Sequence, residues 1–157
     1  MSTMKGKAVV TTLLLSLLAL SEQQCPRSWT QFEESCYIMP DQAVTWLEAK
    51  ELCLEIGGHM VEVDSADENN FLLSIIKNHG ATSSWIGLED FAEEGHFVWS
   101  SSQRVPSYTN WAPHVPDDIN GNQDCGWITN HPAWWAAGLW DDGYCTDKFN
   151  VICERSQ

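Results

Sequence analysis

The sequence contains few basic residues. Eight Lys and Arg stand against 22 Asp and Glu in 157 residues, which gives a formal net charge of −14 at pH 7. Such an acidic chain repels phosphate backbones and anionic headgroups, so we predict neither nucleic acid nor membrane as a partner. Cations and neutral polar ligands remain compatible with this charge. A hydrophobic fraction of 43% and nine tryptophans indicate a folded chain.

Three further features are absent from the sequence. It has no internal repeat, linker or low-complexity segment, so its length predicts a single domain. It has no Cys-x-x-Cys pair, which argues against a zinc cluster. It also lacks an Asn-x-Ser/Thr sequon, so N-glycosylation is not expected.

The single long apolar run lies at the N-terminus. Lys5 and Lys7 precede an apolar stretch over 8–20, and Ala19 and Ser21 supply small residues for cleavage. The alternative is a membrane anchor, but the run is shorter than the ~20 residues a span needs. We predict a signal peptide over 1–21 and a secreted, extracellular domain over 22–157. Removing 21 of 157 residues leaves 136, and losing two lysines takes the charge from −14 to −16.

Six cysteines remain in the predicted mature chain. In an exported protein, an even number of cysteines predicts disulfides and argues against metal ligands or nucleophiles. Spacing alone does not choose among the roughly fifteen pairings that six cysteines allow.

Hydrophobic periodicity predicts two helices. The first covers about 43–56, with Gly57 and Gly58 as its stop, and its apolar face is formed by Trp46, Ala49, Cys53 and Ile56. The second opens with a capping-box pattern over 65–68 and ends near Gly80. Its apolar residues are Phe71, Leu72, Ile75 and Ile76.

Short β-like segments follow over 84–88, 96–99, 124–129 and 150–154. The fold class is therefore α+β, with two helices, short antiparallel sheets and a long irregular segment over 105–146. A segment of this kind inside a compact domain is typically functional.

The irregular segment concentrates hard oxygen donors. These donors are Asp117, Asp118, Asn120, Asn122, Gln123, Asp124, Asp141 and Asp142. Calcium takes about six to eight such oxygens, whereas softer metals prefer His or Cys. The alternative is a set of solvated, turn-forming residues, which composition alone does not exclude.

A series of short motifs runs through the chain in a specific order. They are Cys25-Pro26, Trp29, Cys53, Trp85-Ile86-Gly87-Leu88, Asn110-Trp111, Asp124-Cys125, Leu139 to Asp142, Cys145 and Ile152 to Glu154. In this order the sequence resembles the C-type lectin-like domain over nearly all of the mature chain. It is most similar to secreted single-domain invertebrate lectins, including the perlucin-like group.

The resemblance implies the cysteine pairing of the long form of this domain. The implied pairs are Cys25–Cys36, Cys53–Cys153 and Cys125–Cys145. It also implies two calcium sites. Carried over by position, the principal set falls on Asp117, Gln123, Asp141 and Asp142. The auxiliary set falls on Asp90, Glu94, Asp118 and Gln123.

The sequence departs from the family pattern at one ligand position of the principal set. Val115 stands where sugar-binding members carry Glu or Gln, and its side chain has no oxygen to offer calcium or a hydroxyl group. Pro116 is retained, and the resemblance implies a cis bond between Val115 and Pro116. In the family, Glu-Pro-Asn is the mannose-type tripeptide and Gln-Pro-Asp the galactose-type. Because Val115 fits neither of them, the sequence does not predict which sugar is bound.

Four tryptophans lie in a stretch between Cys125 and Asp141 that is longer than in compact family members. Trp127 and Trp140 are expected in the core, because the resemblance places them at buried positions. Adjacent bulky rings on an irregular loop do not easily both point inward. We therefore predict that at least one of Trp134 and Trp135 forms an exposed platform for the apolar face of a sugar or for a partner surface. The alternative is that both cap the hydrophobic core of the loop.

These patterns predict a secreted, calcium-dependent lectin that binds glycans, with microbial glycans in innate recognition as the suggested target. The alternative is a domain with a degenerate sugar site that binds protein or mineral surfaces through its acidity. The paired Asp141 and Asp142 lack a recognisable nucleophile and base around them, so no enzyme is predicted. Homo-oligomerisation is left open.

Overall fold

The computed structural model describes residues 25–131, 133 and 136–157. The predicted signal peptide over 1–21 lies outside the described residues and stays a prediction. Within the described part of the chain, no helix is long and apolar enough to cross a membrane.

Helix α1 covers Trp46–Glu55, three residues later than the predicted start. The delay has a local cause, because Thr45 and Glu48 form a reciprocal capping box that fixes the first turn. Trp46 and Cys53 are buried as predicted. The placement of Ile56 on the buried face was wrong: it is the C-cap residue and is 37% exposed.

Helix α2 covers Ala66–His79 and ends at Gly80, whose φ of 71° is the left-handed conformation that glycine adopts readily. At its start, the Ser65 hydroxyl accepts a hydrogen bond from the Glu68 amide at 3.1 Å. The predicted capping box is only half formed, because the Glu68 carboxylate instead accepts from the Asp64 amide and the Tyr37 hydroxyl. This buried contact ties α2 to the N-terminal strands.

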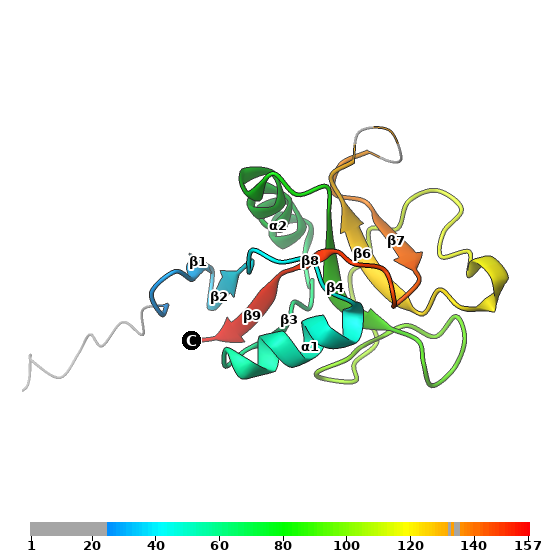
Figure 1. The fold of residues 1–157 in the computed structure, drawn as a ribbon, viewed down its shortest axis with the longest axis horizontal. Helices are drawn as coiled ribbons and strands as arrows, with labels where there is room; N and C mark the ends of the chain where they lie inside the picture. The colour runs from blue at the N-terminus through cyan, green and yellow to red at the C-terminus, as the bar shows by residue number, and fades with distance from the viewer. Residues whose placement is uncertain (1–24, 132, 134–135) are drawn as a thin grey trace, which may run out of the picture.

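Two sheets carry the rest of the fold; in Figure 1 the first lies toward the chain ends and the second toward the yellow irregular segment. The first has the order β1-β2-β9-β3, formed by Thr30–Phe32, Ser35–Ile38, Cys153–Ser156 and His59–Met60. The second has the order β5-β4-β6-β7, formed by Val98–Trp99, Ser83–Glu89, Cys125–Thr129 and Trp140–Gly143. A short 3-10 helix, η1, covers Ile119–Gly121 within the irregular segment.

The single strand predicted over 150–154 was wrong, because the chain divides between the two sheets there. Strand β8 (Asn150–Val151) pairs in parallel with β4, so the pairing is not antiparallel throughout. Strand β9 then joins the first sheet. Between them, the fully buried Ile152 accepts a backbone hydrogen bond from Val61 at 3.0 Å. The crossover thus links the sheets through the core.

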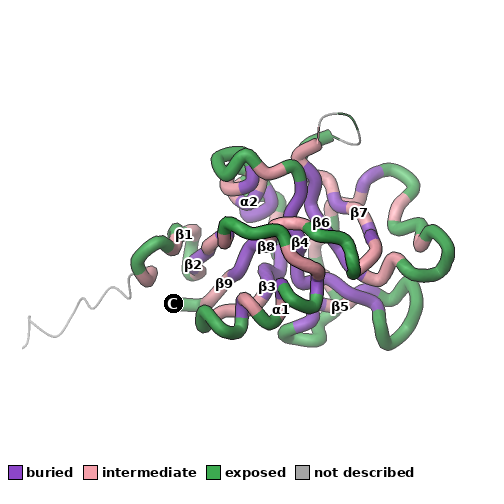
Figure 2. The backbone as a smooth tube through the Cα atoms, in the orientation of Figure 1, coloured by how far each residue is buried: buried purple, intermediate pink, exposed green. Residues whose placement is uncertain are grey.

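The core lies between the helices and the sheets, as the buried segments in Figure 2 show. Trp127 and Trp140 are both buried, which confirms their prediction as core residues. The Trp140 indole donates to the Asn69 side chain at 2.7 Å and so connects β7 to α2. All three implied disulfides, Cys25–Cys36, Cys53–Cys153 and Cys125–Cys145, are present.

Candidate functional site

The segment between Trp111 and Cys125 changes direction several times. The Val115–Pro116 peptide bond is cis, as the resemblance implied. Three non-glycine residues, His114, Asp118 and Asn120, have positive φ angles of 72°, 42° and 62°. These turns bring residues 117–123 back beside β7, where the yellow and orange segments meet in Figure 1.

Asp142 on β7 holds this segment in place. Its side chain is buried at 1% exposure. The Asp117 amide donates to both carboxylate oxygens, at 3.0 and 3.1 Å, and the Asp118 amide donates to Oδ2 at 2.7 Å. Hydrogen bonds to an ionised acceptor are the stronger kind, so this carboxylate is the main anchor of the loop.

Gln123 supplies a second anchor. Its side-chain oxygen accepts from the Ile119 amide at 2.6 Å, and its Nε2 donates to the Asp142 backbone carbonyl at 3.2 Å. Its own amide donates to Asp118 Oδ1 at 3.0 Å. The principal set is therefore gathered around β7, with Asp117 exposed at the surface and Asp141 half-buried next to Asp142. Val115 is half-buried and contributes no side-chain oxygen.

The auxiliary set centres on Asp90, which follows β4 and is only 2% exposed. Its Oδ2 accepts from the Gly95 amide at 2.7 Å, while Oδ1 is buried without a hydrogen-bond partner among the described residues. Burial, together with the charges of Glu94 and Asp124, raises the pKa of the Asp90 carboxyl to about 6. This environment places an incompletely satisfied oxygen among other carboxylates.

Asp124 lies next to Asp90 but belongs to neither of the two calcium ligand sets that the resemblance implies. Its backbone carbonyl accepts from the Asp90 amide at 3.2 Å. Burial and the nearby charges of Asp118 and Glu89 raise the pKa of its carboxyl. The signal for it was its position directly before Cys125, which begins β6 beside β4. Asp124 therefore connects the Asp90 turn to the loop around Asp118.

The donors fit calcium in type, and the fit differs between the two sets. At the auxiliary position, the buried and unpartnered Asp90 Oδ1 is an oxygen that a cation would satisfy. The principal position is one side-chain oxygen short at Val115. Within 25–131, 133 and 136–157, no group of three or more His, Cys, Asp or Glu side chains is arranged to hold a metal. Several predicted ligand atoms accept hydrogen bonds from backbone amides.

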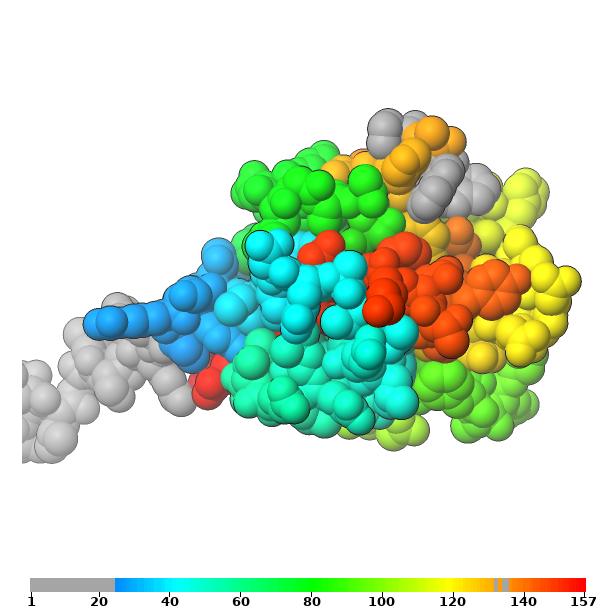
Figure 3. All heavy atoms as spheres, viewed as in Figure 1, coloured from blue at the N-terminus to red at the C-terminus, as the bar shows by residue number. Residues whose placement is uncertain are grey.

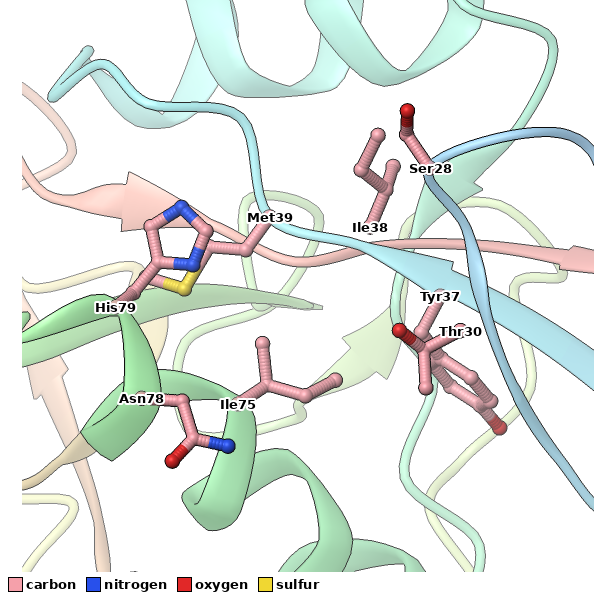
Figure 4. Close-up of a pocket in the computed structure, with 8 residues that line it drawn as sticks. All are labelled: Ser28, Thr30, Tyr37, Ile38, Met39, Ile75, Asn78 and His79. Carbon is pink, nitrogen blue, oxygen red and sulfur yellow. The ribbon is translucent and has the colours of Figure 1, made fainter.

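Two predicted binding residues, Trp134 and Trp135, lie outside the described residues. A pocket of about 340 Å³ elsewhere on the protein contains none of the predicted site residues. As Figure 4 shows, its walls come from the N-terminal strands and the end of α2. They are formed by Ser28, Thr30, Tyr37, Ile38, Met39, Ile75, Asn78 and His79. This pocket is therefore not part of the candidate site, which is formed by the loop over 117–123 and β7.

Comparison with known proteins connects this geometry to one family. The family described as "Lectin C-type domain" matches residues 42–155. The mouse low affinity immunoglobulin epsilon Fc receptor is 32% identical over 132 residues, which cover 83% of this chain but only 37% of the receptor. Salivary C-type lectin 2 of Aedes albopictus is 31% identical over 150 residues, covering 92% of this chain and 98% of that lectin.

A solved structure extends the similarity to three dimensions. The cow C-type carbohydrate-recognition domain of CD23, crystallised in the presence of a GlcNAc2Man3 oligosaccharide, superimposes with a TM-score of 0.74 at 30% identity. The match covers 85% of this chain and 97% of that domain. The fold therefore agrees with the sequence similarity.

Proposed function

Because the chain belongs to the C-type lectin domain family, we propose that it is a secreted, calcium-dependent lectin that binds carbohydrate, with microbial glycans as its target. One observation carries the proposal. The loop over 117–123 is fastened to the Asp142 carboxylate, so the oxygen-bearing side chains of two distant segments lie in one place.

Saccharide hydroxyl groups would be bound by the exposed Asp117 together with Gln123, Asp141 and Asp142. Carboxylate and amide oxygens accept hydrogen bonds from such hydroxyls, and the side-chain amide of Gln123 also donates. Bound calcium would supply a positive charge to which adjacent hydroxyl oxygens coordinate. Asp90, Glu94 and Asp118 would hold calcium at the auxiliary position and so stabilise the turn next to the loop.

Two features support secretion and extracellular action. The three disulfides are typical of proteins from oxidising compartments. The similarity to a salivary lectin over 98% of that protein also points in this direction. The charge of the chain favours neutral glycans over anionic ones.

Calorimetric titration with calcium, followed by glycan-array binding with and without chelator, tests the proposal. Asp117→Ala should abolish glycan binding while leaving the fold intact, because only its backbone amide anchors the loop. Asp41→Ala, an exposed aspartate outside the loop, is the matched control. Glycan binding that persists in chelator, or in Asp117→Ala, would refute the proposed site.

Val115 favours a second candidate function. A domain whose principal site lacks an oxygen could bind a protein or a mineral surface through its acidic face. This alternative predicts that the protein binds no glycan at millimolar calcium but still adsorbs to a calcium mineral, and that added salt releases it.

A further inference from the structure

A pocket of about 440 Å³ lies beside the loop but outside both predicted ligand sets. It is formed where three segments meet: the turn after β4, the chain around η1, and the residues after β7. Figure 3 shows the corresponding green, yellow and red-orange segments adjoining at one end of the molecule. Its walls are Phe91, Asn120, Asn122, Asp124, Tyr144, Cys145 and Thr146.

Phe91 forms an aromatic wall of this pocket. Its side chain is 56% exposed. The ring packs edge-on against the buried Trp46, with centroids 5.4 Å apart and planes at 84°. Its backbone amide donates to Glu89 Oε2 at 2.9 Å. The contact with Trp46 therefore fixes one side of Phe91, while part of its ring remains exposed to a ligand.

The polar walls present hydrogen-bond acceptors. Asn120 Nδ2 donates to the Tyr144 hydroxyl at 3.1 Å, and Asn122 Nδ2 donates to the Asn120 carbonyl at 2.8 Å. These bonds use amide N–H groups, and the side-chain oxygens of Asn120 and Asn122 accept no hydrogen bond from the described residues. Together with the Asp124 carboxylate, they suit a ligand rich in hydroxyl donors.

Charge narrows the class of ligand further. Asp118 and Glu89 lie close enough to Asp124 for their charges to act on its carboxyl. The carboxylate of Asp124 in the pocket wall, with the charges of Asp118 and Glu89 near it, repels sulfated or sialylated sugars but not neutral ones. An aromatic face, amide oxygens and a carboxylate in a cavity of this size match the apolar face and the hydroxyl edge of a neutral sugar ring.

We propose that this pocket is a second saccharide site, which binds one neutral pyranose on the Phe91 ring with its hydroxyls directed to Asn120, Asn122 and Asp124. None of the seven residues predicted for calcium lines it. The site goes beyond the proposed function and shares with it only the class of ligand. Two such sites on one domain would let it contact a branched or repeating glycan at two places.

Saturation-transfer NMR with the methyl glycosides of mannose, galactose and N-acetylglucosamine, at millimolar calcium, tests this site. The variant Asp117→Ala should lose principal-site binding but retain saccharide signals from the pocket. In that background, Phe91→Ala should weaken the remaining affinity roughly fivefold to tenfold. Val105→Ala removes a side chain of similar exposure (60%) outside the pocket and should change nothing.

A blocking variant guards against a folding defect in Phe91→Ala. Thr146→Arg fills the pocket from an exposed wall and should also abolish the remaining signal. Thr82→Arg, at the opposite end of β4, is its control. The second site is refuted if Asp117→Ala loses all binding, or if both pocket variants bind like their controls. If Asp117→Ala binds like the wild type and Phe91→Ala binds nothing, the principal site fails and the pocket stands.

Discussion

Replacing Asp142 by asparagine changes only the group that fastens the binding loop to β7. In the folded protein, its two carboxylate oxygens receive three contacts from the amides of Asp117 and Asp118, at 2.7 to 3.1 Å. Asparagine keeps the size of the side chain but has one acceptor oxygen. Its NH₂ group would face a backbone N–H, so at least one amide loses its acceptor.

The size of the effect follows from the chemistry of these bonds. A hydrogen bond to a charged acceptor contributes about 1.5–3 kcal/mol, and a buried, unsatisfied donor adds to the loss. We therefore expect Asp142→Asn to destabilise the docked loop by about 2–4 kcal/mol. Because β7 pairs independently with β6, the rest of the domain should remain folded.

Amide hydrogen exchange measures this opening locally. Exchange at Asp117 and Asp118 should become at least about 30-fold faster in Asp142→Asn, whereas amides of β6 should keep their protection. Asp117→Asn is the matched control, because it removes a carboxylate from the same loop but keeps the backbone amide that Asp142 binds. Unchanged exchange at both amides in Asp142→Asn would refute the role of this carboxylate as the anchor.

Three other predictions concern calcium, pH and the disulfides. Val115→Glu supplies the missing oxygen and should raise calcium affinity at least tenfold in calorimetry; an unchanged affinity would contradict the principal site. Although burial raises the pKa of Glu62, hydrogen bonds from two serines and an arginine outweigh it and lower this pKa below the ordinary 4.5. Its stabilising contribution is therefore present above pH 4.5 and is lost on acidification. Burial raises the pKa of Glu68, so its contribution is present below pH 4.5 and is lost as pH rises through the folded value. In urea unfolding from pH 3 to 7, Glu62→Gln should therefore lower the free energy of unfolding most near pH 7, and Glu68→Gln should lower it least there. If the loss caused by each variant does not change with pH, both predictions are contradicted. Replacing Cys53 and Cys153 by alanine should lower the free energy of unfolding by about 4.7 kcal/mol, because the unfolded chain gains loop entropy. Replacing Cys25 and Cys36, whose bridge spans 11 residues, should lower it by about 2.8 kcal/mol. Equal losses in urea unfolding would contradict this ranking.

The helices were predictable because each rests on local signals. Gly80 ends α2 where its left-handed φ requires a glycine, and Ser65 caps its start. The start of α1 was misplaced because the Thr45–Glu48 capping box was not read from the sequence. Ile56 has the right helical spacing, but the helix ends before it at Glu55.

Short strands were harder to predict. Strands such as β3 and β8 have two residues each, too few for an alternating pattern, and their pairing depends on distant parts of the chain. The same limit explains the strand over 150–154. Its central residues Val151 and Ile152 favour a strand, but Asn150–Val151 and Cys153–Ser156 pair in different sheets with the buried Ile152 between them.

The sequence predicted which residues form the candidate site, but it did not predict the hydrogen bonds among them. Resemblance placed Asp142 and Gln123 as ligands, whereas the structure shows both holding the backbone of the loop. That role depends on positive φ angles at Asp118 and Asn120, which turn amides toward β7. Asp124 was missed as a partner of Asp90 because their contact crosses from the turn after β4 to the start of β6.

Asp142 and Gln123 have two roles in this proposal: they hydrogen-bond the backbone of the loop, and they would also bind calcium and the ligand. A carboxylate or amide oxygen has two lone pairs. Asp142 Oδ1 and Gln123 Oε1 each accept one backbone amide and can still coordinate calcium, whereas Asp142 Oδ2 already accepts two amides. The backbone bonds therefore leave oxygens for the proposed site and order its ligands before any ion arrives. A ligand that meets an ordered loop does not pay the entropy of fixing it. In this protein the missing oxygen at Val115 weakens the proposed principal site, and the loop anchored by Asp142 offsets part of that loss.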